Sequence, residues 1–217
     1  MLRRQSCERS GFSLVELMIA LSIALTIFGM LSVFQLRTQD SYRQTSAQSR
    51  VDSAARNATT RVLDELSGIA RALLVPDPSS ALGSDTLNFQ RPSAVSNTGA
   101  VTWSTQTRLA LLMDDRETDN GVDDDGDGLV DERRLVLTRE ANTANPEPVT
   151  LCHGVPELYP GETENGVDDN GNGVVDERGF SVRRIGDLLC VRLSVQLVMS
   201  NGGTVTATVD TAVILHN

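Results

Sequence analysis

Residues 12–34 limit the fold of this chain more than any other segment, because they form an apolar run of 23 residues with one charge, Glu16. At a helical rise of about 1.5 Å per residue, this run spans the roughly 30 Å hydrocarbon core of a bilayer. A carboxylate buried there costs roughly 2.5 to 3.5 kcal/mol unless a cation meets it. The run therefore predicts a transmembrane helix in which Glu16 has a cationic partner.

A short motif, Gly11-Phe12-Ser13-Leu14-Val15-Glu16-Leu17, stands at the border of the apolar run. It resembles the prepilin processing motif of type IV pilins and type II secretion pseudopilins. The resemblance implies that a prepilin peptidase cuts between Gly11 and Phe12 on the cytoplasmic side and methylates the new amino terminus. The amine of Phe12, with a reference pKa of about 8, is then a cation that can pair with Glu16 of an adjacent subunit.

The leader, residues 1–11, carries Arg3, Arg4 and Arg9 against Glu8. A basic flank before an apolar segment predicts a cytoplasmic amino terminus and a head on the periplasmic side of the inner membrane. A secretory signal peptide has a shorter apolar core, of roughly 7 to 15 residues, and a small-residue cleavage site, so the run is too long for one. An ordinary single-pass signal anchor remains the alternative.

Cysteine placement gives a further expectation, because Cys7 lies in the leader and processing leaves only Cys152 and Cys190. In an oxidising periplasm we expect these two to form a disulfide worth roughly 3 to 4 kcal/mol. Two buried free thiols are the alternative. Metal ligation by these cysteines is disfavoured, because neither has a Cys or His at the spacing of a zinc finger.

Charge and residue types exclude several classes of function. The chain has 19 basic residues, all of them arginine, against 29 acidic ones, and the acids are concentrated in two short segments. Nucleic-acid binding is therefore not expected. We also expect no enzyme, since His153 and His216 are far apart and no nucleophile or phosphate-loop motif occurs. A hydrolase using Asp123 or Asp168 as general base is the disfavoured alternative.

Beyond the membrane segment, apolar residues recur at helical spacing and no proline interrupts the chain before Pro76. The helix is therefore predicted to continue to about Leu74, with an amphipathic second half over residues 35–75 that packs on a globular domain. A freestanding coiled coil is the alternative. The apolar positions are Val51, Ala55, Ala58, Val62, Leu66, Ile69 and Leu73.

Residues 76–217 have the short apolar segments and turn residues of a β-rich head, and Ser200-Asn201-Gly202-Gly203 predicts a hairpin. The expected class is α+β, and the resemblance implies the pilin fold, a long amino-terminal helix packed on an antiparallel sheet. Residues 79–84 and 141–148 are expected to be exposed loops. The predicted strands are residues 86–89, 101–104, 108–113, 134–138, 180–185, 189–198 and 204–215.

Two acidic segments, the first loop (residues 117–133) and the second loop (residues 162–178), are identical at 13 of 17 positions. Oxygen ligands at alternate positions followed by a glycine wrap a chain around a hard cation, as in EF-hand loops. In the first loop the expected ligands are Asp123, Asp125, Asp127, the Leu129 carbonyl, Asp131 and Glu132. In the second loop they are Asp168, Asn170, Asn172, the Val174 carbonyl, Asp176 and Glu177.

These loops depart from an EF-hand at its twelfth place, where Arg134 and Gly179 replace the bidentate Glu. The missing ligand is expected from Glu132 and Glu177, from upstream residues such as Asn120 and Asn165, or from water. They also resemble MopE-type metal-binding repeats, without the cysteines typical of those. We expect Ca²⁺ in both loops with dissociation constants of roughly 0.1 to 1 mM. The second site should be weaker because Asn170 and Asn172 carry no charge. Two solvated acidic turns are the alternative.

The leading expectation for function is structural: a minor pilin that is processed and then packed by its helix into a type IV pilus. The segment from Arg61 to Arg71 and the Gly11 motif resemble PilW-type minor pilins. A J-type pseudopilin of a type II secretion system and a non-polymerising, membrane-anchored calcium-binding module are the alternatives. The implied partners are prepilin peptidase, the inner membrane and other pilins or pseudopilins, and the final location is a pilus or a periplasmic pseudopilus.

Overall fold

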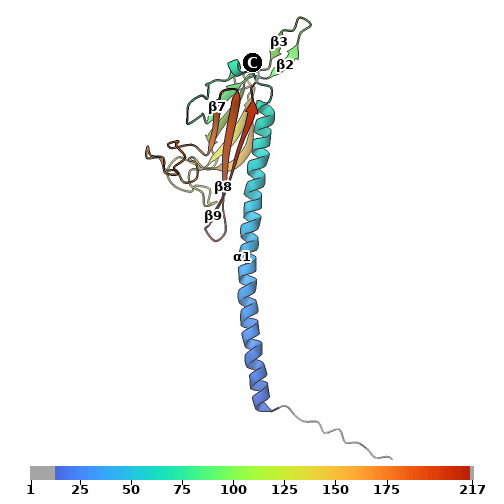
Figure 1. The fold of residues 1–217 in the computed structure, drawn as a ribbon, viewed down its shortest axis with the longest axis vertical. Helices are drawn as coiled ribbons and strands as arrows, with labels where there is room; N and C mark the ends of the chain where they lie inside the picture. Colours follow the sequence, from blue (N-terminus) through green and yellow to red (C-terminus); the bar gives the residue numbers. More distant parts are fainter. Residues whose placement is uncertain (1–12, 216–217) are drawn as a thin grey trace, which may run out of the picture. The chain divides into compact units, whose positions relative to one another are not determined.

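The computed structural model describes residues 13–215, and the chain divides into two compact units, residues 1–44 and 45–217. One helix, α1 (Leu14–Leu66), precedes a short 3₁₀ turn, η1 (Arg71–Leu73), and the described residues then hold nine strands in antiparallel sheets (Figure 1). The expected α+β class is therefore confirmed.

Residues 14–36 of α1 are largely apolar and exposed, and α1 is long and apolar enough to cross a membrane by length and composition. Its hydroxyl side chains donate back to carbonyls one helical turn earlier, as Thr26 does to Ser22 over 2.9 Å. Such bonds satisfy polar groups that lipid cannot. This segment therefore carries few polar groups that need a partner outside it, and Glu16 is its only charge before Arg37.

Ser13 and Glu16 form a capping box at the start of α1. The backbone nitrogen of Ser13 donates to Oε2 of Glu16 over 2.9 Å, and the backbone nitrogen of Val15 donates to Oγ of Ser13 over 3.3 Å. This reciprocal arrangement satisfies donors that the first helical turn leaves unpaired. Glu16 thus has a local structural role in addition to the pairing role that the sequence predicts.

The part of α1 in the second unit buries one stripe in the core of the head, at the helical spacing that the sequence predicts. The helix ends at Leu66, earlier than the expected Leu74, because Gly68 adopts a φ of +79°. A left-handed glycine just beyond the last turn is a common helix stop. The buried apolar stripe consists of Ala47, Val51, Ala55, Ala58, Val62 and Leu66.

The strands form a four-stranded sheet of order β1-β4-β5-β6, a three-stranded sheet of order β7-β8-β9, and the hairpin β2-β3. The expected hairpin at residues 200–203 joins β8 to β9 and is confirmed. The strands are β1 (Thr86–Phe89), β2 (Pro92–Val95), β3 (Val101–Trp103), β4 (Thr107–Met113), β5 (Arg133–Arg139), β6 (Glu147–Val155), β7 (Phe180–Ile185), β8 (Leu188–Val198) and β9 (Thr204–Ile214).

Two of these strands were not expected from the sequence. Strand β6 begins inside the expected loop at residues 141–148, and Pro148 and Gly154 interrupt its alternation. Its pairing with β5 also contains register shifts. Strand β2 is exposed at all four positions, so it has no apolar face to recognise. Both strands owe their conformation to pairing with a neighbour rather than to their own pattern.

The expected disulfide between Cys152 and Cys190 is wrong, because both cysteines within the described residues are free thiols. Cys152 lies on β6 in the core, whereas Cys190 lies on β8 between the core residues Leu189 and Val191. Since neighbouring residues of a strand point to opposite faces, Cys190 lies on the outer face of its sheet. Burial raises the pKa of the Cys152 thiol to about 12.

Glu65, near the end of α1, is a buried acid that ties the helix to the four-stranded sheet and its surroundings. Its carboxylate accepts bonds from Arg91 over 2.9 Å and from Arg139 over 2.5 Å. Burial opposes ionisation of Glu65, but the two guanidinium groups outweigh it and lower its pKa. The helix is thus held on the head by charge pairing as well as by its apolar stripe.

Candidate metal centre

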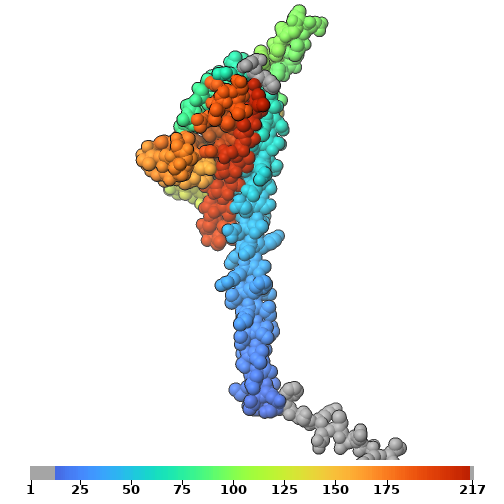
Figure 2. All heavy atoms as spheres, viewed as in Figure 1, coloured from blue at the N-terminus to red at the C-terminus, as the bar shows by residue number. Residues whose placement is uncertain are grey.

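The two acidic loops occupy equivalent places between strands, the first joining β4 to β5 and the second joining β6 to β7. In Figure 2 the second loop, drawn in orange, stands out from the surface of the head. Arg133 and Arg178, which end the two repeats, both donate to Oε1 of Glu157 over 2.6 Å. One carboxylate therefore joins the bases of both loops.

In the first loop, aspartate side chains fold the backbone into a tight wrap. The carboxylate of Asp123 accepts the backbone nitrogens of Gly126 over 2.6 Å and Gly128 over 2.9 Å. Oδ1 of Asp125 accepts the backbone nitrogen of Asp127 over 3.0 Å. Both glycines have positive φ, +80° and +93°, which other residues rarely adopt. The turn predicted from the alternating acids and glycines is therefore present.

This wrap brings five acidic side chains of the first loop together in two groups that share Asp125. One group is Asp123, Asp125 and Asp127, and the other is Glu117, Asp125 and Glu132, each with one oxygen per residue within 4.8 Å of the others. Carboxylate oxygens at this spacing could hold a metal ion.

In the second group, two buried carboxylate oxygens lack a hydrogen-bond donor within the described chain. Oε2 of Glu132 and Oε2 of Glu117 are buried and have no hydrogen-bond partner among residues 13–215. The pKa of Glu132 is raised to about 7, chiefly by burial and also by the charges of Asp127, Glu117 and Asp125, against a backbone hydrogen bond that lowers it. Buried carboxylates without a partner are unfavourable, and a cation bound between them removes that cost.

The first group opens to solvent through a depression next to it. The residues that line this depression are Asp114, Asp115, Arg116, Asp125, Asp127, Glu132 and His153. Nδ1 of His153 lies 2.6 Å from Oδ2 of Asp114. Burial opposes ionisation of Asp114, but His153 outweighs it and lowers the pKa of this acid. An ion therefore has a route from solvent to the acidic groups.

Asp131 has a different role from the one expected. Its carboxylate accepts the backbone nitrogens of Asn120 over 3.0 Å and Gly121 over 2.8 Å, so it closes the loop on itself. It lies outside both acidic groups. The Leu129 side chain is buried, and its carbonyl stays a predicted ligand.

Glu117 is the residue that sequence analysis missed as a candidate ligand. Its Oε1 accepts the backbone nitrogens of Asp124 and Asp125, each over 3.0 Å, which directs the carboxylate into the loop. The available signal was that Glu117 and its counterpart Glu162 open both repeats. An acid at the start of both copies lies outside the twelve residues of an EF-hand pattern, so the pattern does not include it.

The second loop repeats the backbone wrap but not the acidic interior. Asp168 accepts the backbone nitrogens of Gly171 over 2.6 Å and Gly173 over 2.7 Å, and Asp176 closes this loop as Asp131 closes the first. Within the described part of the chain, the groups of three acidic side chains both lie in the first loop. Val174 is half-buried, and its carbonyl stays a predicted ligand.

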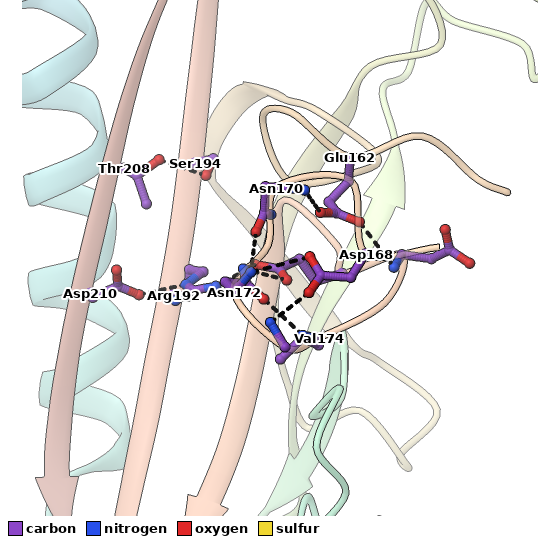
Figure 3. A network of polar contacts seen from close by, with 12 residues as sticks. Glu162, Asp168, Asn170, Asn172, Val174, Arg192, Ser194, Thr208 and Asp210 are labelled. Atoms are coloured by element: carbon purple, nitrogen blue, oxygen red, sulfur yellow. Dashed lines mark hydrogen bonds and ion pairs between the residues drawn. The ribbon is translucent and has the colours of Figure 1, made fainter. Parts of the chain in front are cut away.

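Amide and guanidinium groups donate to the buried acid Glu177 of the second loop, and Figure 3 shows two of the donor residues, Asn172 and Arg192. Nδ2 of Asn172 donates to both oxygens of Glu177, over 2.9 Å and 2.8 Å. Nη1 of Arg192, on β8, donates to Oε1 of Glu177 over 2.5 Å. Asn170 accepts the backbone nitrogen of Asn172 over 3.0 Å. The side chains of Asn170, Asn172 and Glu177, which the sequence predicts as ligands, are therefore engaged in hydrogen bonds within the protein.

The predicted processing residues Gly11 and Phe12 lie outside the described residues, and Glu16 lies in the first turn of α1. No protein-family model matches the chain, and no curated protein or solved structure matches it either. The first loop holds clustered acidic oxygens, two of them buried without a partner among the described residues. In the second loop the corresponding acid, Glu177, is paired with Asn172 and Arg192 of the same chain.

Proposed function

We propose that this chain is a subunit of a type IV pilus, a minor pilin of the PilW type that is anchored in the inner membrane as a precursor. The observation that carries the proposal is the first part of α1, an exposed apolar segment with a single acid, Glu16, close to its start. The Gly11-Phe12 border in front of this acid supplies the cleavage site by resemblance.

The exposed apolar side chains of this segment indicate that it lies in lipid or against other protein rather than in water. Leu14, Leu21, Phe28 and Phe34 are each more than half exposed, as are most of their apolar neighbours. Such a continuous apolar surface on a helix needs lipid or other helices to cover it. In the proposed function lipid covers it in the precursor, and the same segment of neighbouring subunits covers it in the filament.

The order of elements in the head, a helix followed by antiparallel strands, supports this proposal. The second part of α1 buries its stripe in a core shared with antiparallel strands, as in the pilin fold that the Gly11 motif implies by resemblance. The hairpin β2-β3 projects from the head, with Val95, Val101 and Trp103 exposed on it. The head is thus the part available to other subunits or to a surface outside the cell.

We propose further that the first loop binds Ca²⁺, which stabilises the head. Its candidate ligands are all oxygens, which hard cations prefer. Ca²⁺ accepts six to eight such ligands in irregular geometry, so the two overlapping groups around Asp125 suit it better than the strict octahedron of Mg²⁺. The unpartnered oxygens of Glu117 and Glu132 are the strongest support for this ion.

The cleavage step tests the proposed function directly. Gly11→Val is expected to leave the protein at its precursor size, because a branched side chain blocks the position at which the peptidase must cut. Ser10→Val, one position earlier, is the matched control and should be processed normally. Both are compared with the unaltered protein by immunoblot in cells with and without prepilin peptidase. Normal processing of Gly11→Val would count against the assigned cleavage site.

A further inference from the structure

The two loops share one backbone wrap but carry different charges where a cation would lie. Asp125 and Asp127 of the first loop correspond to Asn170 and Asn172 of the second, which are neutral. The glutamates near the two ends of the repeat are the same in both loops: Glu162 corresponds to Glu117, and Glu177 corresponds to Glu132. A second loop that had simply lost its function has no reason to keep Glu177 buried, yet Glu177 is 2% exposed.

The partner of this buried acid is a protein cation. Arg192 donates from Nη1 to Oε1 of Glu177. It also donates from Nε to Oδ1 of Asp210 over 2.7 Å (Figure 3). Its guanidinium also lies over the ring of Tyr159, 4.8 Å from the ring centre. A planar guanidinium held by two acids and an aromatic face is fixed in place. Tyr159 lies three residues before the second loop, and the residue three positions before the first loop is Asp114, which offers no aromatic face.

We infer that the guanidinium of Arg192 takes the place of a metal ion in the second loop, so that this chain binds one divalent cation, in the first loop. The number of ions rests on the proposed function of the first loop, whereas the role of Arg192 does not. This inference replaces the expectation of two sites with a weaker second one.

Electrostatics account for the difference between the loops. The first loop gathers Glu117, Asp125, Asp127 and Glu132 around buried oxygens without partners in the described chain, so an external cation relieves repulsion. The second loop has two amides, two acids and an internal cation, and Asn172 also donates to Glu177. A divalent ion entering there must displace the guanidinium of Arg192 from the buried carboxylate of Glu177, and breaking a buried ion pair is costly.

The number of bound ions tests the inference on the full chain in detergent micelles, by calorimetric titration with Ca²⁺. The unaltered protein is expected to bind one ion, and Asp125→Asn with Asp127→Asn should bind none. Arg192→Gln combined with Asn170→Asp and Asn172→Asp is expected to bind one ion more than the unaltered protein. The matched control carries the two asparagine changes and keeps Arg192. We expect its second loop to bind Ca²⁺ at least tenfold more weakly than the second loop of the triple variant.

Each outcome separates the role of Arg192 from the proposed function. If the unaltered protein binds no ion but the triple variant binds one, the inference stands and the calcium role of the first loop fails. A folded triple variant that gains no ion overturns the inference. Two ions in the unaltered protein also overturn it, as does one ion that persists after Asp125→Asn and Asp127→Asn, and these results need no variant of the second loop.

Discussion

Glu16→Ala is expected to remove the protein from the sheared pilus fraction almost completely, while processed protein still accumulates in the membrane. In the proposed filament, Glu16 pairs with the methylated amine of Phe12 in a low-dielectric bundle. Removing one partner of a buried ion pair costs about 3 to 5 kcal/mol, which corresponds to a loss of more than about 100-fold in subunit affinity. Immunoblots of sheared and membrane fractions measure both quantities.

Glu16→Gln is the matched variant, because Glu16 also accepts the backbone nitrogen of Ser13 in the capping box. Glutamine retains this hydrogen bond but has no charge. We expect the glutamine variant to be absent from the sheared fraction like the alanine variant. Normal abundance of the glutamine variant in that fraction would show that the cap, and not the charge, is what assembly requires.

Chelation of Ca²⁺ is expected to lower the melting temperature of the full chain in detergent by about 3 to 10 °C. With about 10 mM Ca²⁺ and a dissociation constant of roughly 0.1 to 1 mM, binding to the folded state contributes about 1.4 to 2.7 kcal/mol. For a domain of this size, the melting temperature changes by roughly 2 to 4 °C for each kcal/mol of change in the free energy of unfolding. Thermal scans by circular dichroism with calcium and with a chelator give the shift.

The control for this prediction is Asp125→Asn with Asp127→Asn, which removes two of the clustered carboxylates. Its melting temperature should be the same with calcium and with chelator. Adding salt without calcium controls for screening of the acidic loops, because screening acts on all exposed charges. An unaltered melting temperature on chelation of the native protein would contradict the proposed calcium role of the head.

The fold could be predicted from the sequence where the pattern is long and regular. The apolar run and the stripe from Val51 to Leu66 define α1, and the glycine pair of Gly202 and Gly203 defines the last hairpin. Strand β6 could not be predicted, because its conformation depends on pairing with β5. The predicted helix end is too late, because the apolar spacing in the sequence continues through Leu73 although Gly68 already ends the helix.

The backbone conformation of the two loops could be predicted from the sequence, but the pairing of the second loop with a cation of the same chain could not. The alternating acids predicted the wrap around Asp123, because side chain and backbone donor are close in sequence. The pairing of Arg192 with Glu177 joins residues on separate elements, so no local pattern contains it. The same reason explains the wrong disulfide, since only the strand faces reveal that Cys152 and Cys190 point to different sides.

The intact mass of the mature protein, purified from the membranes of cells that possess prepilin peptidase, tests the proposed processing most directly. We expect a chain that begins at Phe12 and carries one methyl group on its amino terminus. An unprocessed chain that still begins at Met1 in those cells would contradict it.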